Sequence, residues 1–273
     1  MGKKSTLELV DVSKVFLKGT VDEVVALDCV NLNVSSGDYV TIIGSNGAGK
    51  TTLLNIIAGT FPPEKGSQVI VDGVDVTQMR EYKHASFVGR VFSDPRVGTS
   101  TGLTVEENMA LALLRGKRRG LKKSTTPKRR ERFREALATL GLGLEDRLSA
   151  VVGTLSSGQR QAVALTMSTL TRPSILLLDE HVANLDPRTA KAVLELTDML
   201  IEREKMTALM VTHNMEVALR FGSRLLMMHR GKIVIDIDHR EKSNLAVNDL
   251  VTAFERAAGE QLVDEAVLLS KAE

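Results

Sequence analysis

The sequence contains no tryptophan, and aromatic residues make up only 3% of its 273 positions. Proteins that bind single-stranded nucleic acid use aromatic side chains as stacking platforms. The scarcity of aromatics counts against that class of function, and we expect no nucleic-acid partner. Charge of one sign is also missing, because 36 basic side chains nearly balance 34 acidic ones. This balance by itself favours no particular partner.

Cysteine occurs once, as Cys29, so no intrachain disulfide can form, which suits a reducing compartment. Long apolar runs are absent as well: no stretch reaches the roughly 18 uninterrupted apolar residues of a membrane span. The mixed composition of residues 7–11 does not resemble a secretory signal. If the protein serves transport, we therefore expect its pore to lie on another polypeptide.

Hydrophobic patterns predict an α/β protein. Strands are expected at residues 6–15, 24–34, 38–43, 68–76, 175–178, 207–212 and 224–228. Helices are expected at residues 53–58, 105–114, 127–140, 157–170, 187–204 and 215–221. Strands that alternate with helices are typical of a mainly parallel sheet covered on both faces. The helical block at about 104–171 is interpreted as an inserted subdomain, and the tail 246–273 as helical.

Residues 44–51, Gly-Ser-Asn-Gly-Ala-Gly-Lys-Thr, match the P-loop pattern in full. Glycines allow successive backbone N–H groups to converge on phosphate oxygens, and the following helix presents its positive end. Lys50 is expected to reach the β- and γ-phosphates of ATP, and the Thr51 hydroxyl to ligate Mg²⁺. The setting between strand and helix disfavours the alternative of a glycine-rich turn without a ligand. The candidate binding residues are Gly44, Ser45, Asn46, Gly47, Ala48, Gly49, Lys50, Thr51 and Thr52.

An apolar strand at residues 175–178 ends in Asp179 and Glu180. A strand buried on both faces places its terminal carboxylates at the sheet edge where α/β folds bind ligands. Asp179 is expected to hold Mg²⁺ through water, and Glu180 to act as the general base on the attacking water. The alternative is a strand that ends in two solvated acids, and the upstream P-loop argues against it.

Residues 155–159, Leu-Ser-Ser-Gly-Gln, open a helix about twenty residues before Asp179. Serine and glycine at a helix start supply a hydroxyl and accessible N–H groups, which form a second anion-binding site. Here the chain resembles the ABC ATPase family, whose signature is usually Leu-Ser-Gly-Gly-Gln, with Ser157 replacing the first glycine. The resemblance implies a P-loop NTPase with an antiparallel N-terminal β subdomain and an inserted helical subdomain. It further implies one nucleotide-binding domain over 1–273, with a catalytic core at about 5–103 and 172–245.

The resemblance assigns further roles by position. It implies that Phe16 stacks on adenine, that Asp186 in the Ala-Asn-Leu-Asp loop 183–186 communicates across a dimer, and that His213 contacts the γ-phosphate. It also implies a head-to-tail homodimer in which the signature of one copy completes the other copy's site, through Ser156, Ser157, Gly158 and Gln159. The implied catalytic residues are Glu180, His213 and Lys50. The implied partners are transmembrane permease subunits and an extracytoplasmic substrate-binding protein, which places the chain at the cytoplasmic face of the membrane.

The position after the strand that ends at residues 91–92 also departs from the family pattern. After the strand that ends at residues 91–92, the family usually has a glutamine that contacts Mg²⁺ and water, and this chain has Ser93. Serine is too short to span the same distance without a bridging water. We hypothesise that Ser93 weakens metal contact and slows turnover; the alternative is that a water substitutes and the rate is unaffected.

A basic stretch covers residues 115–134, with Glu131 as its one acid. It contains Arg115, Lys117, Arg118, Arg119, Lys122, Lys123, Lys128, Arg129, Arg130, Arg132 and Arg134. Such a stretch can be a solvated face, a contact with anionic lipid headgroups beside a transporter, or a nucleic-acid site. All three interpretations stay open at this stage.

Three short segments, residues 59–62, 115–121 and 178–181, resemble bacterial uptake cassettes that work with permeases of the branched-chain amino-acid type. His181 replaces the proline that most cassettes carry after the catalytic glutamate. The resemblance implies an importer of an amino acid or related small solute. The alternative is a soluble single-cassette ABC ATPase that acts in cofactor assembly or on nucleic acid. A cassette does not touch cargo, so its sequence does not identify the solute.

Overall fold

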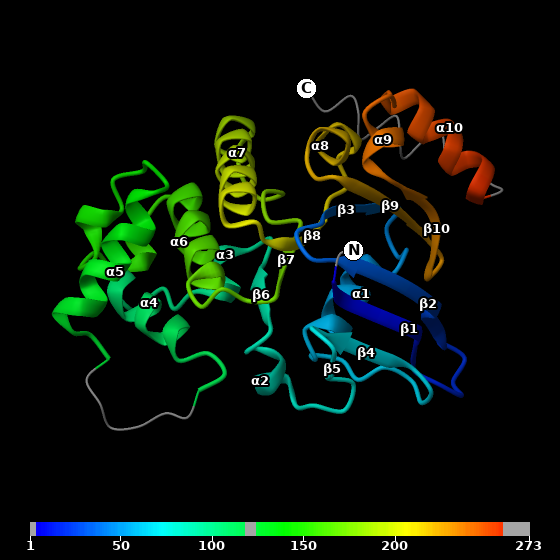
Figure 1. Cartoon of the computed structure of the whole chain (residues 1–273), viewed down its shortest axis with the longest axis horizontal. Helices are drawn as coiled ribbons and strands as arrows, with labels where there is room; N and C mark the ends of the chain where they lie inside the picture. Colours follow the sequence, from blue (N-terminus) through cyan, green and yellow to red (C-terminus); the bar gives the residue numbers. More distant parts are fainter. Residues whose placement is uncertain (1–3, 118–123, 259–273) are drawn as a thin grey trace. The chain divides into compact units, whose positions relative to one another are not determined.

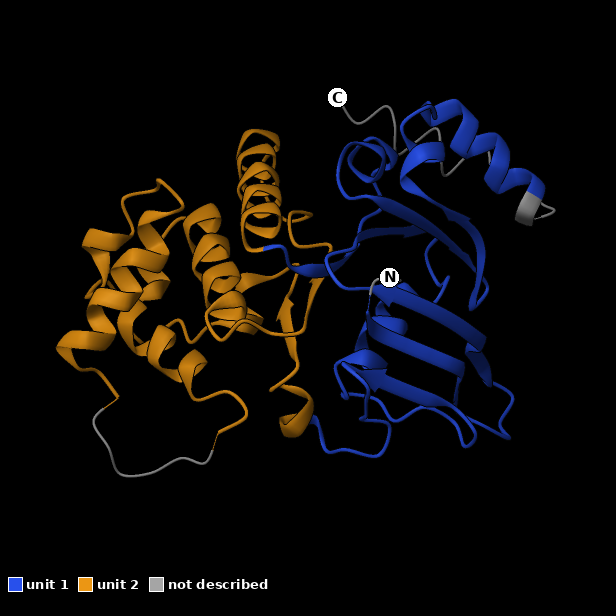
Figure 2. Cartoon of the chain, viewed as in Figure 1, with its two compact units in different colours: residues 1–81, 205–273 blue, residues 82–204 orange. Residues whose placement is uncertain are grey.

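The computed structural model describes residues 4–117 and 124–258. The chain forms two compact units, one made of residues 1–81 and 205–273 and the other of residues 82–204 (Figure 2). Strands and helices follow the order expected from the sequence (Figure 1). Each unit contains both strands and helices, and each is described by itself below.

The first unit contains an antiparallel sheet with the strand order β2-β1-β4-β5. Its strands are β1 (Ser5–Phe16), β2 (Val24–Ser35), β4 (Gln68–Val71) and β5 (Val74–Asp75). The sequence predicted one strand over 68–76. The structure divides this segment at Asp72 and Gly73, whose positive φ values of 51° and 79° make a two-residue hairpin turn.

A second sheet in the same unit carries the phosphate loop. Its strands are β3 (Tyr39–Gly44), β8 (Thr207–Val211), β9 (Arg224–His229) and β10 (Lys232–Ile237), in the order β10-β9-β3-β8. The strands β8, β3 and β9 are parallel, whereas β10 returns antiparallel to β9. Residues 39–43 are all buried, as are all five residues of β8, because helices and strands cover both faces of the parallel strands.

The helices of this unit are α1 (Lys50–Ile57), α8 (Met215–Arg220), α9 (His239–Lys242) and α10 (Val247–Ala258). Leu250 and Phe254 of α10 belong to the same buried cluster as Ile43 and Met227. Lys242 is buried in this layer, and its ammonium donates to the carbonyl oxygens of Phe221 and Gly222. The charge is therefore held by backbone acceptors, which offset the cost of burying it.

The second unit is built around two parallel strands and a helical layer. The strands are β6 (Val88–Val91) and β7 (Ile175–Asp179), and every residue of β7 is buried. The helices are α2 (Glu81–His84, whose first residue belongs to the other unit), α3 (Pro95–Gly98), α4 (Val105–Leu113), α5 (Pro127–Ala138), α6 (Ser157–Thr169) and α7 (Pro187–Glu204). Met109, Phe133 and Val163 bring α4, α5 and α6 into one apolar core.

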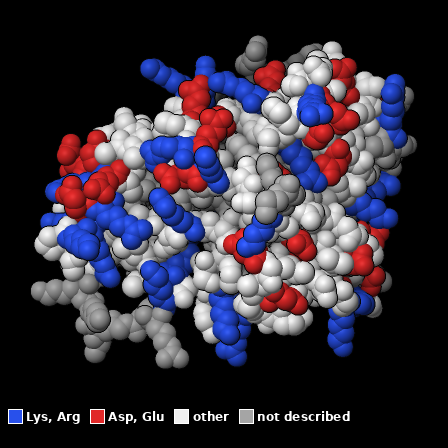
Figure 3. Space-filling view, in the orientation of Figure 1, with Lys and Arg blue, Asp and Glu red and all other residues white. Residues whose placement is uncertain are grey.

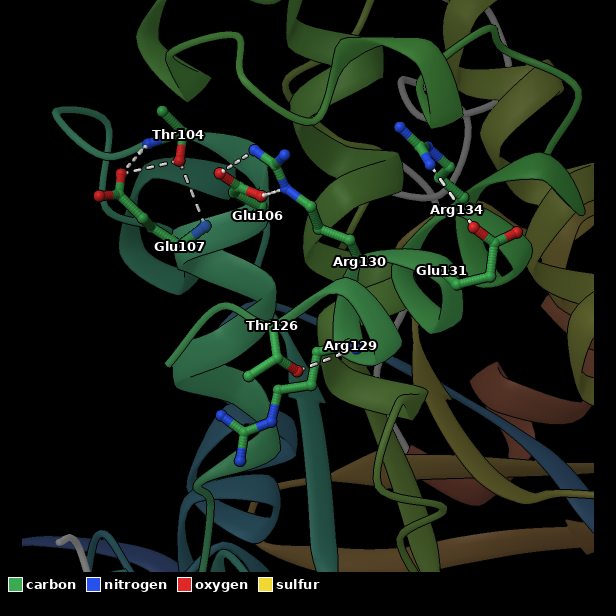
Figure 4. A network of polar contacts seen from close by, with 8 residues as sticks. All are labelled: Thr104, Glu106, Glu107, Thr126, Arg129, Arg130, Glu131 and Arg134. Carbon is green, nitrogen blue, oxygen red and sulfur yellow. Dashed lines mark hydrogen bonds and ion pairs between the residues drawn. The ribbon is translucent and has the colours of Figure 1, made fainter. Parts of the chain in front are cut away.

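Part of the basic stretch is used in contacts within this unit (Figure 4). Arg130 of α5 forms a two-pronged ion pair with Glu106 of α4, next to the capping box of Thr104 and Glu107 that starts α4. Arg132 donates to the carbonyl oxygen of Leu170 at 2.7 Å. On the visible face, basic and acidic side chains stand beside one another (Figure 3). Arg118, Arg119, Lys122 and Lys123 lie outside the described residues, and the role of the stretch stays a prediction.

Within the described ranges, no helix is both long enough and apolar enough to cross a membrane.

Candidate nucleotide site

The phosphate loop lies between the end of β3 and the start of α1. Gly49 has φ of 100°, and a Cβ at this position would lie 2.4 Å from the Ala26 carbonyl oxygen. Glycine is therefore required both by the backbone conformation and by the close approach of another strand. The loop leads directly into the N-terminus of the eight-residue helix α1, where backbone N–H groups favour an anion.

Lys50 is the first residue of α1 and is only 7% exposed. Its Nζ donates to the Gly44 carbonyl oxygen at 2.6 Å and to the Ser45 carbonyl oxygen at 3.0 Å. The ammonium therefore lies across the mouth of the loop. This is the position from which a lysine neutralises phosphate charge in a P-loop. Thr51 and Thr52 follow in the first turn of the same helix.

His213 comes two residues after the end of β8. The parallel register pairs Ile42 with Val211, so Gly44 and His213 continue their neighbouring strands to the same edge of the sheet. The His213 side chain is exposed at this edge. The geometry thus brings His213, the predicted γ-phosphate contact, to the sheet edge from which the phosphate loop emerges.

Phe16 is the last residue of β1 and is half-buried. Its ring packs edge to face with Phe61, with a centroid separation of 5.5 Å and an angle of 80° between planes. The Lys14 ammonium lies 5.5 Å from the centre of the Phe16 ring. The Phe16 ring thus packs against Phe61, a contact that the sequence did not predict.

The acidic pair of the second unit lies at the end of β7. Asp179 is 9% exposed, and its Oδ2 forms an ion pair with Nη2 of Arg90 at 2.7 Å. Glu180 has φ of 46°, a left-handed conformation that costs a non-glycine residue free energy. Its carbonyl oxygen accepts from the Ala183 N–H at 2.9 Å, which closes a tight turn. The turn directs the chain away from the strand immediately after the proposed base.

The signature segment opens α6, as the sequence suggested. The Ser156 hydroxyl accepts from the Gln159 N–H at 3.2 Å, and the Gln159 side chain accepts in return from the Ser156 N–H at 3.3 Å. This reciprocal pair is a capping box, which fixes the first turn of a helix. Ser157 is the first residue of the helix and Gly158 the second. The substitution of Ser157 for glycine therefore leaves the local helix start intact.

Gly158 and Asp186 lie close to one another through one residue of α7. A Cβ on Gly158 would lie 2.4 Å from Cγ2 of Thr189, so the signature helix needs glycine there. The carboxylate of Asp186 accepts from the Thr189 N–H at 3.1 Å, and hydrogen bonds from Thr189 lower the pKa of Asp186. The structure thus brings together two elements that the sequence analysis predicted to act at a dimer interface.

Ser93 follows β6, and the next residue, Asp94, caps the short helix α3. The Asn184 side chain donates to the Ser93 carbonyl oxygen at 3.3 Å. On the other side, Gln161 of α6 donates to the Phe92 carbonyl oxygen at 3.0 Å. Two side-chain hydrogen bonds therefore hold the backbone at Phe92 and Ser93, and they fix the position of the Ser93 Cα from which the short side chain extends.

His181 is 1% exposed and lies directly after the acidic pair. The Thr197 hydroxyl donates to the Val193 carbonyl oxygen at 2.7 Å, so it accepts from Nε2 of His181 at 3.2 Å. This arrangement places the proton of the neutral ring on Nε2. Burial lowers the pKa of His181 to about 4, and the imidazole is uncharged at neutral pH. His181 thus packs against Thr197 of α7, in keeping with its place outside the predicted site.

The predicted residues fall into two groups, one in each unit. The first unit holds the phosphate loop, Phe16 and His213, and the second holds Ser93, the acidic pair, the signature and Asp186. Arg90 was not singled out in the sequence, although a lone arginine inside the otherwise apolar strand 88–91 is a signal that could have found it. A buried charge in such a strand needs a partner, and Asp179 is that partner.

The fold and the loop between β3 and α1 define a P-loop nucleotide-binding protein. The sequence profile described as "ABC transporter" matches residues 27–183, more than half of the chain. The chain belongs to the ABC transporter family, and it is an ATP-binding, ATP-hydrolysing cassette. The predicted family and fold class are therefore confirmed.

Several proteins are similar over most of the chain. A tyrosine transport ATP-binding protein of Clostridioides difficile strain R20291 is 42% identical over 251 residues, covering 92% of this chain and 99% of the relative. The methionine import ATP-binding protein MetN of Rhizobium johnstonii is 33% identical over 234 residues, covering 85% of this chain and 60% of the relative. Among solved structures, the dimeric ATP-binding cassette MJ0796, in a post-hydrolysis state bound to ADP and Pi, is 30% identical. The TM-score is 0.73, over 86% of this chain and 99% of that one.

Proposed function

We propose that this chain is the ATP-binding and ATP-hydrolysing subunit of a transporter that imports an amino acid or related small solute through a separate permease. The observation that carries the proposal is the 42% identity to a tyrosine transport ATP-binding protein along almost the full length of both chains. The similarity to a methionine import ATP-binding protein supports the same class of solute. The proposed location is the cytoplasmic face of a membrane, with a binding protein as a further partner.

The residues of the phosphate loop fit a nucleoside triphosphate. Lys50 and the N–H groups at the start of α1 would bind the phosphates, with Phe16 against the adenine and His213 near the γ-phosphate. A hydroxyl at Thr51, a carboxylate at Asp179 and a hydroxyl at Ser93 are oxygen donors of the kind that Mg²⁺ prefers. Mg²⁺, when bound, would supply positive charge that stabilises the transferred phosphoryl group. Glu180 would orient the attacking water and accept its proton at a carboxylate oxygen.

The proposal includes a second copy of the chain. The capped start of α6, formed by Ser156, Ser157, Gly158 and Gln159, would face the γ-phosphate held by the other copy. Half of the electrostatic stabilisation would then come from the partner, which explains why a single subunit should hydrolyse ATP slowly. The dimeric assembly of a solved cassette with 30% identity supports this arrangement. The predicted domain limits, with a helical subdomain at about 104–171, belong to the same proposal.

The test is reconstitution with the permease. The chain should co-purify from detergent-solubilised membranes with a multi-span protein, which is then identified. The complex is placed in proteoliposomes, and ATP is supplied on the side of the membrane that carries the cassette. Uptake of labelled tyrosine or methionine should require ATP and should fail with the Lys50→Ala variant. Purification of the chain without any membrane partner, together with full ATPase activity alone, would contradict the proposal.

Replacement of Ser93 by glutamine tests the departure from the family pattern at this position. In the assembled complex, Ser93→Gln is expected to raise the ATP turnover rate about threefold or more, because the longer amide can contact metal and water directly. Ser93→Ala is the matched control, since it keeps the side chain short and removes the hydroxyl. The measurement is steady-state phosphate release at several Mg²⁺ concentrations. An unchanged or lower rate in Ser93→Gln would show that a water already fills this role.

A further inference from the structure

The ion pair between Arg90 and Asp179 lies at the position where the proposed function requires a divalent metal. The guanidinium Nη2 and the carboxylate Oδ2 are 2.7 Å apart, and each side chain is only 12% exposed. Charges this poorly hydrated depend strongly on their ion-pair partners, so removal of one partner destabilises the charge of the other. Arg90 therefore contributes directly to the electrostatic environment of Asp179.

The strand register explains how the two side chains meet. In the parallel pair of β6 and β7, Arg90 lies opposite Leu177, so it points to the same face as Leu177. Asp179 is two residues further along β7, so its side chain lies on the same face. The long side chain of Arg90 extends along this face to the Asp179 carboxylate. The guanidinium also lies over the ring of Phe92, 4.5 Å from its centre. A cation over an aromatic face is attracted by the ring, so Phe92 helps to fix the arginine.

We propose that Arg90 is the resident counter-charge of Asp179: it holds this carboxylate in place and weakens its attraction for a divalent metal. The inference rests on the proposed role of Asp179 toward Mg²⁺. A carboxylate has about four acceptor positions, so Asp179 can keep the arginine at one side and accept from metal-bound water at another. The metal and the Arg90 guanidinium would then both be attracted to the single negative charge of Asp179, and these two positive groups would repel each other. Arg90 is in this sense a positioning residue that sets the metal concentration at which the site loads.

The test is a comparison of metal affinity in variants that cannot turn over. In a Glu180→Gln background with saturating ATP, the free Mn²⁺ concentration that gives half of the rise in melting temperature is measured. Removal of the guanidinium in Arg90→Met should lower this concentration at least about tenfold, because even well-hydrated charges a few ångströms apart change an equilibrium several-fold and the metal carries two charges. Without metal, the variant should melt at a lower temperature than its parent.

Three controls separate charge from structure. Arg90→Lys keeps the positive charge and should stay within about threefold of the parent. Arg90→Gln, which removes the charge and keeps a polar side chain, should follow Arg90→Met. Arg96→Met removes a guanidinium from the exposed pair with Asp94 in the same unit and should leave the Mn²⁺ midpoint unchanged. A merely structural role of Arg90 would lower the melting temperature without strengthening metal binding.

The outcomes distinguish this inference from the proposed function. Asp179→Asn should abolish the dependence on Mn²⁺, and a normal response in that variant would overturn the metal role of Asp179 itself. If Asp179→Asn loses the response while Arg90→Met and Arg90→Gln bind Mn²⁺ equally or more weakly than the parent, the metal site stands and the role given to Arg90 is overturned.

Discussion

Glu180→Gln is expected to bind ATP with nearly unchanged affinity and to lose at least about a hundredfold of its hydrolysis rate. A positioned general base contributes about 10²- to 10⁴-fold to a reaction, and an amide of the same shape cannot accept the proton of the attacking water. ATP that is bound but not hydrolysed should hold two copies together, so dimers should accumulate. The measurements are phosphate release, equilibrium binding of ATP, and molecular mass in solution with ATP.

A matched control for this variant lies on the same unit. Glu202 is an exposed residue of α7, and Glu202→Gln makes the same chemical change away from the sheet edge. It should leave hydrolysis unchanged within about twofold. Brisk hydrolysis by Glu180→Gln would show that another group accepts the proton and that Glu180 is assigned wrongly.

Lys50→Ala is expected to weaken ATP binding by at least about a hundredfold. The lysine would give charge-assisted hydrogen bonds to the phosphates, each of which contributes about 1.5–3 kcal/mol. The alanine variant also loses the two hydrogen bonds from Nζ to the carbonyl oxygens of Gly44 and Ser45. Its melting temperature without nucleotide must therefore be measured beside the affinity for ATP.

Lys191, an exposed residue of α7, provides the control for the loss of one positive charge. Lys191→Ala should bind ATP like the parent protein in an isothermal titration. If Lys50→Ala folds normally and still binds ATP tightly, the loop between β3 and α1 is not the phosphate site. The melting curve shows whether a loss of ATP binding in Lys50→Ala is caused by unfolding of the variant.

Most of the fold could be predicted from local patterns in the sequence. Helix starts such as Thr104 and Ser156 carry their own capping signals, and buried strands such as residues 175–178 are short apolar runs. The strand β10 was not predicted, because its partly exposed residues lack the pattern of a fully buried strand. Its pairing depends on the tight turn at Arg230 and Gly231, which returns the chain to β9.

The candidate site was predictable to the extent that its chemistry is local. The phosphate loop and the acidic pair are contiguous motifs, so their residue types and setting are readable from the sequence. The contact of Arg90 with Asp179 joins residues that are 89 positions apart, and it depends on the register of β6 and β7. The roles of Phe16, Asp186 and His213 came from resemblance rather than from pattern, and they stay predictions.

The left-handed backbone at Glu180 implies that this protein loses some thermal stability in return for catalytic activity. An L-residue in this conformation costs about 1–3 kcal/mol, which glycine would largely avoid. A Glu180→Gly variant should therefore lose the general base and yet resist heat at least as well as its parent. Selection for thermal stability alone would replace the glutamate. Its presence at a strained position indicates that catalytic function is kept at a cost in stability.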